Sequence, residues 1–219
     1  MKLFLDCSDI ELIKHGVSTG LIDGVTTNPS LMKKCGQEPL EVIKQISDLF
    51  PWTASVSAEV VGETAVEMLD MAEEYINISP NITIKLPCTR EGLKACKELH
   101  HDEVPVNITL IFSATQAILA AKVGATYVSP FIGRLNDQYW DGISLVEEIA
   151  DVYATHGSKT QVLAASIREP RQVPACFRVG ADICTLPYDI FQKCYDHCLT
   201  DSGLQKFDSD WNQLQDELK

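Results

Sequence analysis

The most constraining feature of this sequence is a regular alternation of short apolar segments with amphipathic segments along its whole length. The pattern over residues 63–76 is typical of a helix, with Met68, Leu69 and Ala72 on one face and Glu67 and Glu74 opposite. Strict β/α alternation predicts a parallel sheet, and eight repeats close a barrel. We therefore expect an α/β fold, a (β/α)8 TIM barrel. The eight predicted strands are Leu3–Asp6, Gly24–Asn28, Ala54–Val60, Ile82–Leu86, Val106–Phe112, Tyr127–Ile132, Gln161–Ile167 and Ile183–Pro187.

The chain of 219 residues shows no linker or composition shift, so one domain over residues 1–219 is predicted. A tail over residues 202–219 follows the eighth repeat and has the apolar spacing of an extra C-terminal helix. Its apolar residues are Leu204, Phe207, Trp211, Leu214 and Leu218. This stripe needs a partner, and the pattern leaves open whether it packs on its own barrel or on a neighbouring subunit.

Composition narrows the classes of partner. The net charge of −13 argues against a nucleic-acid partner, because such binding depends on Lys and Arg that neutralise phosphates. No apolar run reaches the roughly 18 residues of a membrane helix, so no membrane partner is expected. The eight cysteines and five histidines form neither a CxxC motif nor a zinc-ligand pattern. We expect reduced thiols, a cytoplasmic location, no metal and no cofactor.

Lys85 is a charged residue out of place in an apolar strand. It follows Ile82-Thr83-Ile84 and precedes Leu86-Pro87, whereas most other lysines have polar neighbours. Burying an ammonium costs several kcal/mol unless it is paired, and burial favours the neutral amine that attacks carbonyl groups. The alternatives are a lysine that reaches solvent from the strand end, or one paired with a carboxylate for structure alone.

Other predicted strands also carry polar residues near their C-terminal ends, which is where the mouth of a barrel forms. On the fifth, sixth and seventh predicted strands, two such residues are two positions apart, so both side chains point to the same face of the strand. Each residue taken alone also has a purely structural explanation, since Asp, Asn and Ser at strand ends often cap the next helix. Together they suit Schiff-base chemistry on a phosphorylated sugar. They are Asp6, Thr26, Thr27 and Asn28, Glu59, Asn107 and Thr109, Ser129 and Phe131 with Arg134, and Ser166 with Arg168.

Six segments resemble, in order, the signature segments of the transaldolase family: LDCSD, GVTTNPSLM, ITIKLP, NITLIFS, SPFIGR and LAASIREPRQ. The resemblance runs through nearly the whole chain. Its length is similar to that of the short subfamily, which also contains fructose-6-phosphate aldolases. This implies a homo-oligomer, because short relatives form pentamer rings, in some cases a decamer of two rings, through a C-terminal helix that crosses to a neighbour.

The resemblance implies a metal-free class I mechanism and a place in the pentose phosphate pathway. Lys85 would hold a dihydroxyacetone unit, taken from sedoheptulose 7-phosphate or fructose 6-phosphate and passed to glyceraldehyde 3-phosphate or erythrose 4-phosphate. Asp6 would handle protons beside the bond that breaks, and Glu59 and Thr109 would position a water. The implied substrate-binding residues are Asn28, Asn107 and Ser129 for the fragment's hydroxyls, and Arg134, Ser166 and Arg168 for the phosphate.

Two activities compete within this family. The aldolase branch resembles a pattern with Gln in place of Glu59 and Tyr in place of Phe131, and it lacks Asn107 and Ser129. The residues present favour a transaldolase, with a fructose-6-phosphate aldolase as the alternative. More distant alternatives are a non-catalytic sugar-phosphate-binding barrel and a phosphate-binding isomerase, but the isomerase leaves Lys85 and Asp6 unexplained.

Overall fold

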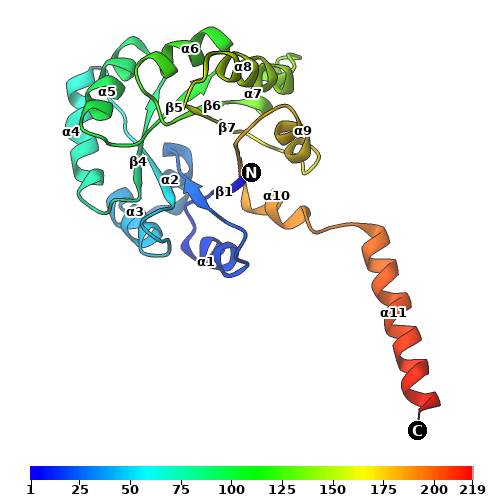
Figure 1. Ribbon diagram of the computed structural model, residues 1–219. Coiled ribbons are helices and arrows are strands. Elements are labelled where there is room, and N and C mark those ends of the chain that lie inside the picture. The colour runs from blue at the N-terminus through cyan, green and yellow to red at the C-terminus, as the bar shows by residue number, and fades with distance from the viewer. Residues whose placement is uncertain (219) are drawn as a thin grey trace.

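Eight parallel strands pair in chain order and close on themselves, so the predicted (β/α)8 barrel is confirmed in this computed structural model, which describes residues 1–218 (Figure 1). The first strand pairs with both the second and the last, which completes the closure. The strands are β1 Lys2–Asp6, β2 Gly24–Thr26, β3 Ser55–Glu59, β4 Ile82–Pro87, β5 Val106–Ile111, β6 Tyr127–Pro130, β7 Gln161–Ala164 and β8 Ile183–Leu186.

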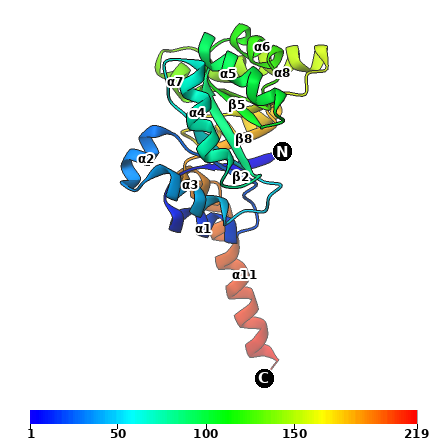
Figure 2. The same ribbon diagram turned by 90° about the vertical axis from the view of Figure 1, so that its left-hand side faces the viewer.

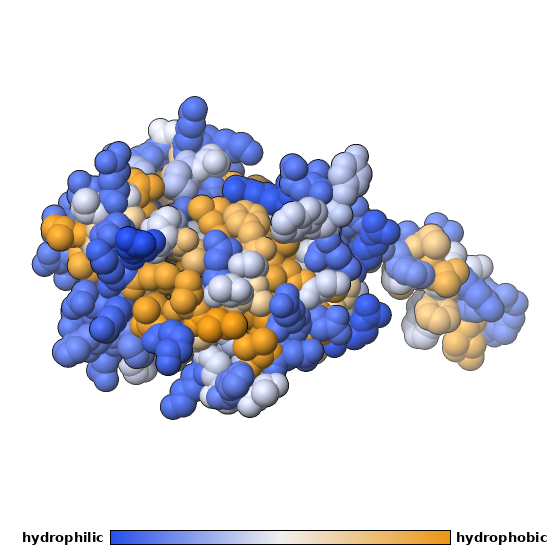
Figure 3. Space-filling model, turned by 90° about the horizontal axis from the view of Figure 1, so that it is seen from above, coloured by the Kyte–Doolittle hydropathy of each residue, from blue (hydrophilic) through white to orange (hydrophobic). Residues whose placement is uncertain are grey.

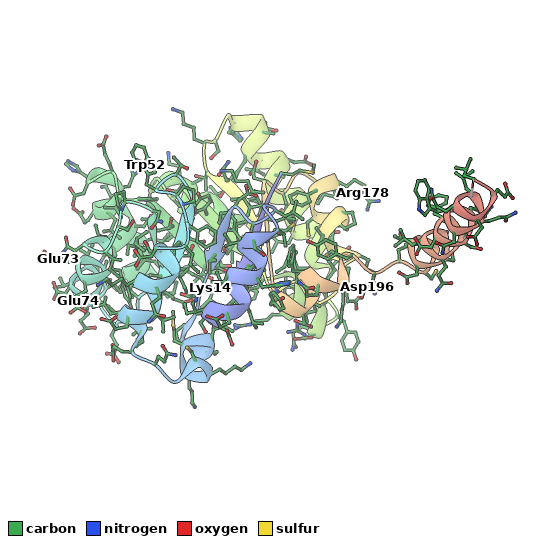
Figure 4. The ribbon with its side chains drawn as sticks, turned by 90° about the horizontal axis from the view of Figure 1, so that it is seen from below. Lys14, Trp52, Glu73, Glu74, Arg178 and Asp196 are labelled. Atoms are coloured by element: carbon green, nitrogen blue, oxygen red, sulfur yellow. The ribbon has the colours of Figure 1, made fainter. Side chains whose placement is uncertain are left out.

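Helices surround the strands and bury their apolar faces against the barrel (Figures 1 and 2). Thr64 begins α4 with a capping box, in which Thr64 and Glu67 satisfy each other's backbone N–H groups. Met68 and Ala72 of that helix are buried, while Glu73 and Glu74 lie at the outer surface (Figure 4). The helices are α1 Ile10–Ser18, α2 Pro29–Cys35, α3 Pro39–Ser47, α4 Ala65–Ile76, α5 Arg90–His101, α6 Ala114–Lys122, α7 Ile132–Asp137, α8 Gly142–His156, α9 Gln172–Arg178, α10 Tyr188–Lys193 and α11 Cys198–Glu217.

The side chains that point into the barrel form layers, each supplied by alternate strands. Strand register and the two-residue alternation assign every layer. The two layers deep in the barrel are Gly24, Thr83, Tyr127 and Ile183, and then Phe4, Ser57, Asn107 and Leu163. The two layers toward the C-terminal ends of the strands are Thr26, Lys85, Ser129 and Thr185, and then Asp6, Glu59, Thr109 and Ala165.

The deep layers combine apolar side chains with buried polar ones such as Ser57 and Thr83, and all are well packed. The rings of Phe4 and Tyr127 meet edge to face with their centroids 6.3 Å apart. Gly24 faces Phe4, and a Cβ there would lie 2.4 Å from the Ser55 carbonyl oxygen, so the close approach of β2 and β3 requires glycine. This packed floor leaves the upper two layers as the base of an open mouth.

Several predicted strands extend too far at their C-terminal ends, and the predictions for those residues were wrong. β2 ends at Thr26 because the Asn28 side chain caps α2, where it accepts a hydrogen bond of 3.0 Å from the Leu31 N–H. β6 ends at Pro130 because α7 begins at Ile132. β7 ends at Ala164, and Ser166 takes a left-handed backbone conformation with φ of 58°. Ser166 and Arg168 therefore lie in the loop before α9, beyond the strand.

The predicted C-terminal helix exists as α11, which begins at Cys198, earlier than expected; Lys219 lies outside the described residues. It extends away from the barrel beyond Asp196 (Figures 1 and 4). None of its described side chains is buried. Apolar atoms are visible on its surface in Figure 3. Across residues 1–218, no helix is both long and apolar enough to cross a membrane.

Candidate active site

A cavity of about 450 Å3 opens at the C-terminal ends of the strands, above the packed floor of the barrel. All eight residues of the two upper layers line it, while those of the layer that holds Phe4 and Asn107 do not. Ten of the eleven residues predicted for the site line this one cavity, and Asn107 is the exception. The structure thus brings these ten residues together around one mouth.

Lys85 lies in the floor of the cavity as a buried ion pair. Its Nζ is 2.8 Å from Glu59 Oε2 and donates a hydrogen bond of 2.9 Å to the Thr27 carbonyl oxygen. Only 5% of the lysine side chain and 15% of the glutamate side chain are exposed. Glu59 is also the Cα partner of Lys85 in the register of β3 and β4, so strand pairing itself brings the two together. A structural ion pair alone would not need an open cavity above it.

Asp6 stands on the opposite side of the mouth and receives hydrogen bonds from its neighbours. Thr26 Oγ1 donates to Asp6 Oδ1 over 2.8 Å, and the Asn28 side chain also contacts the carboxylate. Burial raises the pKa of Asp6 above its ordinary value, against the opposing effects of Lys85 and of the bonds from Thr26 and Asn28. A carboxylate held in this way can accept a proton and return it.

Thr109, Ser129 and Asn107 occupy successive depths below the mouth. Ser129 Oγ donates to Asn107 Oδ1 over 2.7 Å, and Asn107 Nδ2 donates to Ser57 Oγ over 3.5 Å. Asn107 thus supports Ser129 from the layer below. The sequence predicted that Asn107 itself binds the substrate, whereas in the structure it lies behind Ser129 and does not line the cavity. Thr109 Oγ1 is buried and finds no hydrogen-bond partner among residues 1–218, which is costly unless a ligand or water supplies one.

Two arginines gather at the outer side of the cavity, where α7 meets the loop before α9. The Arg134 guanidinium lies 4.8 Å from the centre of the Phe131 ring, and Arg168 Nη1 donates to Asp137 Oδ1. Gly133 permits this arrangement, because a Cβ there would lie 2.7 Å from Arg168 Nε and 2.3 Å from the Ser166 carbonyl oxygen. Two guanidinium groups and a hydroxyl suit a phosphate.

Two residues of the mouth hold a backbone conformation that costs energy outside glycine. Leu110 and Ser166 have φ angles of 59° and 58°, and both line the cavity. The β5–β6 register shifts between Ile108 and Ile111, at the point where Leu110 lies. Such strain persists at sites where the surrounding structure holds it in place.

The site also contains residues to which no role was assigned from the sequence, although Thr26 was among the polar residues at the predicted strand ends. Thr26 and Thr185 line the cavity, and their hydroxyl oxygens are 2.7 Å apart. Lys34, exposed on α2, joins Lys85, Arg134 and Arg168 as a fourth basic residue of the cavity. Asp137 holds Arg168 in place. A polar Thr185 within the apolar run of β8 was a usable signal, whereas an exposed lysine such as Lys34 gives none. Within residues 1–218, no cluster of three or more His, Cys, Asp or Glu side chains could hold a metal ion.

Comparisons with known proteins find similar sequences over nearly the whole chain. The sequence model of the transaldolase/fructose-6-phosphate aldolase family matches residues 3–218. Proteins named probable transaldolase are similar to the chain: that of Methanococcus vannielii is 48% identical over 97% of this chain and 98% of its own. That of Cereibacter sphaeroides is 49% identical over 96% and 95%. A thiamine phosphate pyrophosphorylase from Pyrococcus furiosus has the same fold, with a TM-score of 0.59, 16% identity and coverage of 84% and 85%.

The burial of Asp6 predicts opposite effects of Asp6→Asn on stability and on activity. Because the folded protein raises the pKa of Asp6, ionisation is less favourable in the folded than in the unfolded state. Asp6→Asn should therefore raise the free energy of unfolding at pH 7, and this gain should vanish as the pH falls below about 4. Denaturant unfolding at both pH values measures it.

Turnover should fall by about 10²–10⁴-fold in the same variant, the usual contribution of a general acid–base group. Asp208→Asn, at an exposed position of α11, is the control and should change neither quantity. Lower stability of Asp6→Asn at pH 7 would show that the Asp6 charge stabilises the fold, contrary to this account.

Proposed function

The chain belongs to the transaldolase/fructose-6-phosphate aldolase family, and we propose that it works as a transaldolase in which Lys85 carries the transferred fragment. The donor is sedoheptulose 7-phosphate or fructose 6-phosphate, and the acceptor is glyceraldehyde 3-phosphate or erythrose 4-phosphate. The single observation that carries the proposal is the buried Lys85–Glu59 pair at 2.8 Å in a cavity shared with Asp6, Arg134 and Arg168. The free cysteines fit work in the cytoplasm.

Glu59 begins the reaction by accepting a proton from Lys85 Nζ, which frees the amine to attack the ketose carbonyl carbon. Attack gives a carbinolamine, and loss of its hydroxyl as water gives an iminium. Glu59 is within direct hydrogen-bond distance of the nitrogen. The unsatisfied Thr109 hydroxyl is available to hold the departing water beside it.

Asp6 then accepts the proton of the hydroxyl on carbon 4, and the bond between carbons 3 and 4 breaks. Its electron pair moves into the iminium, which becomes an enamine, and an aldose phosphate leaves. In the second half the enamine attacks the aldehyde carbon of the acceptor, and Asp6 returns its proton to the new alkoxide. Water finally hydrolyses the iminium. Asn28 and Ser129 bind the hydroxyls of the fragment, with Asn107 behind Ser129.

The phosphate of the donor or acceptor binds Arg134, Ser166 and Arg168. Arg168 already faces a carboxylate in Asp137, so its guanidinium is oriented before the phosphate arrives. Orientation lowers the entropic cost of binding. The same clamp serves both half-reactions, because the leaving aldose and the incoming one carry a phosphate at the same end.

Trapping with borohydride tests the nucleophile. Fructose 6-phosphate with borohydride should add the mass of a reduced dihydroxyacetone unit to the peptide that carries Lys85, as read by mass spectrometry. Lys193, exposed on α10 and paired with Asp189, provides the matched control: Lys193→Ala should keep the adduct and Lys85→Ala should lose it. An adduct that survives Lys85→Ala contradicts the mechanism.

Phe131 separates transfer from simple cleavage. It lines the cavity between Phe112, with ring centroids 5.9 Å apart, and the guanidinium of Arg134. A phenyl ring supplies no proton to the enamine, so the fragment stays bound until an acceptor arrives. Phe131→Tyr should raise the release of dihydroxyacetone without acceptor, about 10-fold or more if the phenol acts as a general acid. Phe112→Tyr is the neighbouring control, and equal release from both variants opposes this role.

We also propose that the chain forms a homo-oligomer, with a decamer of two pentamer rings as the implied form, and that α11 supplies the contact. The helix has 20 residues and exposes an apolar series that includes Leu204, Phe207 and Trp211. Isolated helices of this kind are marginal in water, so a packing partner is needed. Removing residues after Gly203 should reduce the assembly to monomers in light scattering. An unchanged mass would assign the contact to other surfaces.

A further inference from the structure

A chain of hydroxyl groups leads from β8 to Asp6 through the layer of the barrel that also holds Lys85. Thr185 Oγ1 and Thr26 Oγ1 are 2.7 Å apart, and Thr26 Oγ1 is 2.8 Å from Asp6 Oδ1. Both threonines are 2% exposed, so bulk water does not substitute for these bonds. Neither residue has a place in the mechanism above.

The direction of the chain follows from counting protons. A hydroxyl carries one proton, and Thr26 gives its proton to the carboxylate. The bond between the two threonines therefore has Thr185 as donor and Thr26 as acceptor whenever Asp6 is ionised. Protons point along the chain from Thr185 to Thr26 to Asp6, and each bond polarises the next.

We propose that Thr185 and Thr26 are positioning residues that hold Asp6 in its ionised, proton-accepting state in spite of its burial. This inference rests on the proposed function and concerns the carbon–carbon cleavage step alone. Strand register makes the arrangement rigid, since Asp6 pairs with Thr26 on β2 and Phe4, two residues earlier on the same face, pairs with Thr185 on β8. The hydroxyls oppose the desolvation of the carboxylate, because a hydrogen bond to the charged form favours it.

Other groups that act on Asp6 are few. Lys85 attracts its charge from β4, and the Asn28 side chain donates to it from the start of α2. Cys7, the next residue, has a pKa raised by its own burial. Ionisable side chains of α10, which packs on β1, are engaged on the outer surface, Tyr188 with His15 and Asp189 with Lys193. Glu59, which exchanges a proton with Lys85 in the mechanism, is a second carboxylate of the cavity, so Asp6 is read from the shift that the threonine substitutions cause and not from the limb itself.

The test is the pH dependence of kcat/KM for fructose 6-phosphate with erythrose 4-phosphate in the full-length protein. Thr26→Val removes a hydrogen bond to a charged group, so its acidic limb should move up by about one pH unit. Thr185→Val removes the outer bond, and its limb should move in the same direction by about a few tenths of a unit. Thr26→Ser and Thr185→Ser keep the hydroxyl and should restore the wild-type limb. In the residual activity of Asp6→Asn, adding Thr26→Val should no longer move the limb.

Thr83→Val is the matched control. Thr83 Oγ1 and Ser55 Oγ form another buried hydroxyl pair, 2.8 Å apart, deeper in the barrel and away from the cavity. Breaking it should lower the unfolding temperature about as much as the other substitutions without moving the limb. Unmoved limbs in Thr26→Val and Thr185→Val, or an equal shift in Thr83→Val, would overturn the inference.

Borohydride trapping in the same variants separates this inference from the proposed function. The total adduct on Lys85, of intact fructose 6-phosphate and the three-carbon fragment together, should form in Thr26→Val and Thr185→Val as in the wild type, because the iminium forms before the step that Asp6 serves. Absence of the adduct in the wild type sinks the proposed function. A normal adduct with unmoved acidic limbs sinks only the role of the hydroxyl chain.

Discussion

The ion pair between Lys85 and Glu59 imposes the strongest physical demand on this barrel. Two charges lie nearly out of water, at a cost that is recovered only when partners and geometry are well matched. The register of β3 and β4 brings the two side chains together, and the Thr27 carbonyl oxygen accepts a hydrogen bond from Lys85 Nζ. Removing one partner of such a pair costs about 3–5 kcal/mol. The rest of the mouth is organised around a site that stays charged, buried and open on one side.

Layering inside the barrel explains how the site divides its work. Lys85 and the two threonines of the hydroxyl chain share one layer, and Asp6, Glu59 and Thr109 lie in the layer above. In the proposed reaction, the nucleophile and the proton carriers therefore face the same fragment from two layers, while the arginines lie at the end of the cavity where α7 meets the β7–α9 loop. The apolar floor of Phe4, Tyr127 and Leu163 keeps these positions fixed. In the proposed reaction, each polar group of the substrate therefore meets side chains of complementary chemistry.

Much of this arrangement was predictable because strand periodicity and polar residues at strand ends are local signals. Lys85, Asp6 and Glu59 stood out in apolar surroundings, and ten predicted residues share the cavity. Local pattern does not encode depth, so Asn107 was expected at the surface of the cavity although it lies beneath Ser129. Nor does it encode the left-handed turn at Ser166, the contact of Asp137 with Arg168, or the approach of β8 to β2 that joins Thr185 to Thr26. These depend on closure of the barrel.

The central claim is that the enzyme keeps the three-carbon fragment on Lys85 until an acceptor takes it. The most direct measurement is the consumption of fructose 6-phosphate by the wild-type protein with and without erythrose 4-phosphate. We expect turnover that depends on the acceptor, with sedoheptulose 7-phosphate and glyceraldehyde 3-phosphate formed in equal amounts. Turnover at the same rate without acceptor, with free dihydroxyacetone released, would contradict it.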